Sequence, residues 1–150
     1  MRSDSWDLTN MEPFKAEKVK DNLLGDMGVS FDKHSNKFTL SKTDKFLDSE
    51  KVYVYFETTD KAITDGQREI YQNVKENFKK MVESAFHYLT VDKKYLDTSF
   101  YYKAASITIL EKSDNWPGNW QLDLINLKDG FSHVLVEFDN DKPVDFSAQA

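Results

Sequence analysis

The chain has 150 residues, no cysteine and a formal net charge of −6 at pH 7. This length is typical of one domain with its own core, and the lack of cysteine excludes disulfides and thiolate metal sites. The acidic N-terminal segment contains no apolar run typical of a secretory signal, and no later segment has the roughly 18 apolar residues that a membrane span requires. We therefore expect a single cytoplasmic domain over residues 1–150, without membrane association.

The N-terminal quarter predicts an arm, a helix and a hairpin. Residues 1–12 have few apolar side chains and predict a loosely anchored arm. A proline suits the first position of a helix, and the apolar spacing after it favours a short helix over residues 13–24 that ends at Gly25. Segments 29–32 and 37–41 flank turn-forming residues, which predicts a small hairpin.

The middle of the chain predicts one strand and one long helix. Residues 50–57 alternate apolar and polar side chains, as a strand with one buried face does. Thr64 and Gln67 have the spacing of a capping box, which marks the start of a helix. Its apolar stripe recurs at steps of three and four residues: Ile70, Val74, Phe78, Met81, Val82, Ala85 and Leu89.

The C-terminal third predicts four strands, at residues 106–112, 120–127, 131–138 and 144–148. Pro117 and Gly118 have the sequence of a type II turn between the first two strands. Pro143 lacks an amide proton for the ladder, so the last strand should be an edge.

The register of the 120–127 and 131–138 hairpin depends on its loop. A two-residue loop would pair Leu124 with Leu135, whereas a three-residue loop with Gly130 in the left-handed conformation would pair Leu124 with Val134. Only the second register gathers the apolar side chains on one face, so we expect it. The predicted fold is α+β: an antiparallel sheet, with a C-terminal four-strand meander plus strands from the N-terminal half, and one long amphipathic helix packed across one face.

No residue pattern points to catalysis, a cofactor or a metal. His34, His87 and His133 lack the spacing of metal ligands, and His133 should lie diagonal to Asp123 on the polar face of the hairpin. None of the five glycines falls in a phosphate-binding motif, and only two arginines are present to contact a nucleic acid. We therefore expect no catalytic residues, no cofactor, no metal and no nucleic-acid partner.

The distribution of charge favours a basic protein partner. Residues 101–150 hold four basic and eight acidic residues, although an acid excess also serves solubility alone. Trp116 lies on the Pro-Gly turn, where an aromatic side chain can anchor a partner or pack on the sheet edge. The candidate partner-binding residues are Asp114, Trp116, Asp123, Glu137, Asp139 and Asp141.

The order of GVSFD, KVYVYFET, a helix beginning TDGQREIYQNV, and the closing WQLDLIN, SHVLVEFD and KPVDFS resembles small uncharacterised bacterial α+β proteins. Several families of this kind are immunity proteins that neutralise a cognate toxin. The resemblance implies inhibition by binding, without turnover, of a basic toxin domain. The alternative is an enzyme or small-ligand protein with a pocket between helix and sheet, for which Tyr53, Tyr55, Asp123 and His133 are the candidates.

Overall fold

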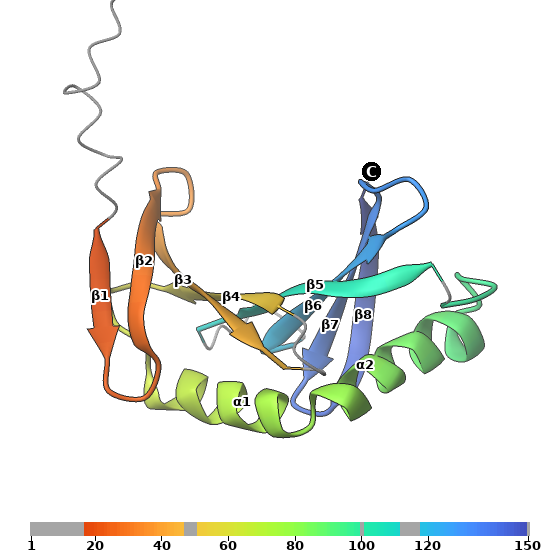
Figure 1. Cartoon of the computed structure of the whole chain (residues 1–150), viewed down its shortest axis with the longest axis horizontal. Coiled ribbons are helices and arrows are strands. Elements are labelled where there is room, and N and C mark those ends of the chain that lie inside the picture. Colours follow the sequence, from red (N-terminus) through yellow and green to blue (C-terminus); the bar gives the residue numbers. More distant parts are fainter. Residues whose placement is uncertain (1–16, 47–50, 100, 112–117, 150) are drawn as a thin grey trace, which may run out of the picture.

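Eight strands and a helical crossover form a sheet-dominated α+β fold (Figure 1). The computed structural model describes residues 17–46, 51–99, 101–111 and 118–149. The strands lie in the sheet in chain order: β1 (Lys18–Asp21), β2 (Gly25–Asp32), β3 (Lys37–Lys45), β4 (Lys51–Thr58), β5 (Tyr102–Ile109), β6 (Trp120–Asn126), β7 (His133–Asp139) and β8 (Lys142–Gln149).

Every neighbouring pair of strands is antiparallel except β4 and β5, which are parallel. A parallel pair needs a long crossover connection, and the helical segment between β4 and β5 supplies it. The sheet is therefore mixed. The strands predicted at the C-terminus form half of one continuous sheet, with β1 and β8 at its two edges.

The helical crossover is interrupted, so the prediction of one long helix is wrong. Helix α1 (Asp65–Glu76) ends at Asn77, helix α2 (Phe78–His87) follows, and a single π-helical segment η3 (Tyr88–Asp92) completes it. The Asn77 side chain donates to the Asn73 carbonyl at 3.0 Å and to the Asn73 side chain at 2.9 Å. The backbone of Asn77 is not helical, with a φ of −118° and a ψ of 21°, although its amide still donates to the Asn73 carbonyl. The capping box of Thr64 and Gln67 is confirmed.

The predicted helix over residues 13–24 is also wrong where the structure describes it. Residues 18–21 form β1, which pairs with β2, and a turn follows them. Val19 lies opposite the buried Met27, so cross-strand burial overrides the weak helical spacing. The first residues of that helix and the arm over residues 1–12 lie outside the described residues.

The predicted register of the β6–β7 hairpin is confirmed. Leu124 pairs with Val134 and Leu122 pairs with Val136, and Gly130 has a φ of 78°. The loop is longer than the three residues expected, because β6 ends at Asn126 and β7 begins only at His133. The last strand is an edge, as Pro143 indicated.

The core lies between the helices and one face of the sheet. Val74, Phe78, Met81 and Ala85 of the predicted stripe are buried, while Ile70 is only partly buried. The sheet contributes alternate residues from its strands, as a half-buried sheet does. These are Leu40, Val52, Val54, Phe56, Ile107, Ile109, Trp120, Leu122, Leu124, Val134, Val136 and Phe138. No helix within the described ranges is long and apolar enough to cross a membrane.

The predicted Pro117–Gly118 turn lies partly outside the described residues, so its type stays a prediction, but Gly118 itself lies close to the backbone of β7. A Cβ atom on Gly118 would lie 2.4 Å from the carbonyl oxygen of Phe138. The neighbouring Asn119 amide donates to that same carbonyl at 2.8 Å. Glycine is therefore required here for close approach of two backbones.

Candidate functional site: the open face of the sheet

Both helices lie on one side of the sheet, and among the described residues no helix covers the other side, here called the open face (Figure 1). Because side chains alternate along a strand, the residues between the core positions point to this face. Two rows cross its centre through paired residues: Thr43, Tyr53, Ser106, Asp123, Leu135 and Ser147, and, beside them, Ser41, Tyr55, Thr108, Gln121, Glu137 and Asp145.

Two carboxylates are directly opposed on this face. Glu137 of β7 pairs with Asp145 of β8. Like charges opposite each other on neighbouring strands destabilise a sheet. Gln121 donates to Glu137 at 3.2 Å, but within the described ranges neither carboxylate has a lysine or arginine partner in an ion pair. The open face therefore carries a local excess of negative charge over β7 and β8.

A histidine–aspartate contact lies next to this pair. The Nδ1 atom of His133 is 2.8 Å from Oδ1 of Asp123, and both side chains are partly buried. This is the diagonal contact predicted from the sequence. It orients the Asp123 carboxylate on the open face, and its second oxygen has no hydrogen bond to another described residue.

The structure describes four of the six predicted partner-binding residues and places them in two locations. Asp123 and Glu137 lie on the open face. Asp139 and Asp141 instead lie at the β7–β8 turn, and the Asn73 side chain of α1 donates to Asp141 at 2.7 Å. Asp114 and Trp116 lie outside the described residues. The β7–β8 turn thus places Asp141 in contact with α1 and Asp139 at the cavity beside that helix, apart from Asp123 and Glu137.

Tyr53 and Tyr55 have a different location from the one predicted. They were candidates for a pocket between helix and sheet, yet both side chains point to the open face, away from the helices. Tyr53 is 55% exposed, and its ring stacks on that of Tyr55 with centroids 6.4 Å apart and an interplanar angle of 15°. His133 and Asp123 are on the same face. These four residues therefore line no pocket between helix and sheet.

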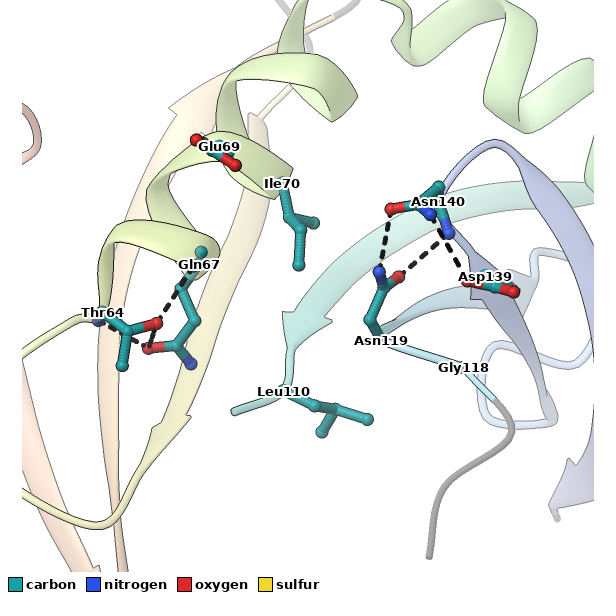
Figure 2. Close-up of a pocket in the computed structure, with 10 residues that line it drawn as sticks. Thr64, Gln67, Glu69, Ile70, Leu110, Gly118, Asn119, Asp139 and Asn140 are labelled. Atoms are coloured by element: carbon teal, nitrogen blue, oxygen red, sulfur yellow. Dashed lines mark hydrogen bonds between the residues drawn. The ribbon is translucent and has the colours of Figure 1, made fainter. Parts of the chain in front are cut away.

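Sequence reasoning missed a cavity of about 380 Å³ at the start of α1 (Figure 2). It lies between α1 and the β7–β8 turn, with Ile70 and Leu110 as apolar lining and Asn119 and Asn140 on the opposite wall. The two asparagines hydrogen-bond each other through side chain and backbone, at 2.9 and 3.0 Å. Gln67 donates to two strand carbonyls, at 2.9 and 3.2 Å. The side-chain amides of Gln67, Asn119 and Asn140, which line the cavity, therefore already form hydrogen bonds within the protein.

No signal in the sequence could have indicated this cavity, because its walls come from four separate segments.

Among the residues that the structure describes, no group of three or more histidine, cysteine or acidic side chains could hold a metal ion. Comparison of the chain with models of known protein families, with curated proteins and with solved structures found no match. The open face and this cavity are candidate sites within the described residues.

Proposed function

We propose that this chain is a non-catalytic protein-binding module, an immunity-type inhibitor that neutralises a bacterial toxin domain. The basic surface of the toxin domain would dock on the open face over β6, β7 and β8. The observation that carries this proposal is the direct opposition of Glu137 and Asp145. Repulsion between the two carboxylates lowers the stability of the free protein. Positively charged side chains of a basic partner would offset this repulsion and bind both carboxylates.

Electrostatics predicts how this surface would act. Complementary charge raises the association rate more than it raises affinity, and salt screens the effect. Glu137 is half-exposed and Asp145 is exposed, and both lie near a third carboxylate, that of Asp123. The three together produce a negative electrostatic potential over this part of the open face. The partner should therefore bind faster at low ionic strength.

The test is co-expression and purification of this chain with the protein encoded beside its gene, followed by binding kinetics. Glu137→Lys combined with Asp145→Lys should slow association and weaken its dependence on salt. The matched control is Glu76→Lys combined with Glu83→Lys, two exposed acids on α1 and α2 that change the net charge equally. Equal effects of the two double variants, or none, would contradict docking on the open face.

The cavity at the start of α1 favours a second candidate function, an enzyme or small-ligand protein. Its volume of about 380 Å³ lies in the range of about 300–1,000 Å³ typical of ligand sites. A thermal-shift screen with small polar metabolites would test it, with Ile70→Trp as the variant that fills the cavity. A ligand that stabilises the original chain but not Ile70→Trp would favour this function over protein binding.

A further inference from the structure

A tyrosine, a serine and an aspartate stand side by side on the three central strands of the open face. Tyr53 of β4 pairs with Ser106 of β5, and Ser106 pairs with Asp123 of β6. The small serine therefore separates an exposed aromatic ring from a carboxylate that His133 orients. The neighbouring row repeats the pattern in part, with Thr108 between Tyr55 and Gln121.

The spacing of this row suits one cationic side chain. Neighbouring strands lie about 4.8 Å apart, so a cation above Ser106 would be about 5 Å from the tyrosine and from the aspartate. A cation attracts an aromatic ring when it lies within about 6 Å of the centroid. The same position is within reach of an ion pair with the Asp123 carboxylate.

We propose that the row of Tyr53, Ser106 and Asp123 binds an arginine side chain of the basic partner; this deepens the proposed function and rests on it. A guanidinium group is planar, so it can stack on a tyrosine ring while its edge donates two hydrogen bonds to a carboxylate. A lysine ammonium is a strongly hydrated point charge that makes neither contact as well. The row thus selects arginine over lysine.

The stacked tyrosine pair supports this assignment. The Tyr53 ring lies nearly parallel to the Tyr55 ring, so two aromatic rings lie together on this part of the face. Paired residues on both sides of the two rings are small, namely Ser41, Thr43, Ser106 and Thr108, which leaves the rings accessible to a partner. Tyrosine and arginine are both enriched at the energetic centres of protein interfaces.

The test uses two probes, hexa-arginine amide and hexa-lysine amide, titrated into the isotope-labelled chain and followed by NMR. We expect shifts at Tyr53, Tyr55 and Asp123, and a preference for the arginine peptide of about two- to fivefold, the size of an exposed cation–π contact. Tyr53→Ser combined with Tyr55→Ser should reduce the preference, because only the hydrogen bonds to Asp123 would remain, whereas Tyr53→Phe should keep it. Asp123→Asn should weaken both peptides.

The control for a lost aromatic ring is Phe131→Ala, because Phe131 is 61% exposed but lies in the β6–β7 loop. Equal affinity of the original chain for the two peptides, or a preference that the double tyrosine variant leaves unchanged, would overturn the arginine assignment. The arginine site and the proposed function can be contradicted by different results. If the Glu137 and Asp145 reversals slow toxin binding while the tyrosine variants leave it unchanged, the acidic surface stands and the arginine site does not.

Discussion

The two faces of the sheet differ in what their side chains contact. On the covered face, large apolar residues such as Phe56, Trp120 and Phe138 are fully buried under the helices. On the open face, the central positions hold serine, threonine, tyrosine and acids, with no helix above them. The covered face supplies most of the stability, because buried apolar area is the main favourable term in folding. The side chains of the open face can consequently vary with less effect on stability.

The largest effect should come from Phe78 of α2, which is buried in the core between the helices and the covered face. Phe78 is 2% exposed, and its ring lies 4.8 Å from that of Phe46. Phe78→Ala should lower the free energy of unfolding by about 3–5 kcal/mol, as removal of a packed aromatic ring does. Tyr53→Ala on the open face should cost less than about 1 kcal/mol. Urea denaturation of both variants tests this, and similar losses would remove the distinction between the faces.

A second effect should come from Gly118, where two backbones approach closely. Gly118→Ala would place a Cβ atom 2.4 Å from the Phe138 carbonyl oxygen, so β6 or β7 must shift, at a cost of about 1–3 kcal/mol. Gly66→Ala is the control, because its Cβ would meet only Thr64 Oγ1 at 3.8 Å. That variant should gain about 0.4–1 kcal/mol by restricting the unfolded chain. Thermal unfolding should show opposite signs, and a stable Gly118→Ala would contradict the close approach.

A third effect concerns the polar link between the β1–β2 turn and α1. The Asp21 carboxylate accepts hydrogen bonds from the Leu23 and Leu24 amides, at 2.9 and 3.1 Å, and from Arg68 at 2.6 and 3.1 Å. The hydrogen bond from Arg68 holds the pKa of Asp21 below its usual value, while burial acts the other way. At pH 7, Asp21→Asn should cost about 1.5 kcal/mol.

The pH dependence of this link follows from the direction of the shift. A lowered folded-state pKa adds stability above the unfolded-state value of about 3.9, and that stability is lost as the pH falls toward the folded-state pKa. Between pH 5 and pH 3 the original chain should therefore lose more stability than Asp21→Asn. If the free energy of unfolding of the two proteins fell equally across this pH range, the role of Asp21 would be contradicted.

The covered face was the part of the fold that the sequence predicted best. Strict alternation in β4, β6 and β7 specifies which side is buried, and Gly130 selects the register between two alternatives. The prediction was wrong where local pattern and tertiary contact disagree. β1 forms because β2 pairs with it, and the helix is interrupted at Asn77, whose backbone is not helical.

The open face was predicted less well, because it depends on which strands become neighbours. The row of Tyr53, Ser106 and Asp123 requires the parallel β4–β5 pairing, which the sequence does not indicate. The opposition of Glu137 and Asp145 requires the irregularity in pairing after Glu137. A simple two-residue turn at Asn140 and Asp141 would pair Glu137 with Val144 instead, so the acidic pair could not be found from spacing alone.

The smallest effect, and the one that joins stability to function, should come from Asp145. Asp145→Asn removes the repulsion from Glu137, and Asp145→Lys adds an opposite charge, so the two should stabilise the fold by about 0.3 and 0.6 kcal/mol. Ser147→Lys is the control, because Ser147 is on the same strand and face but opposite Leu135. Salt should reduce the gain of Asp145→Lys, since screening weakens charge pairs near the surface. Denaturation at low and high salt measures this, and a loss of stability in Asp145→Asn would mean that the carboxylate contributes to the fold itself. A gain accompanied by slower toxin association would instead show that recognition keeps the acid in place at the expense of stability.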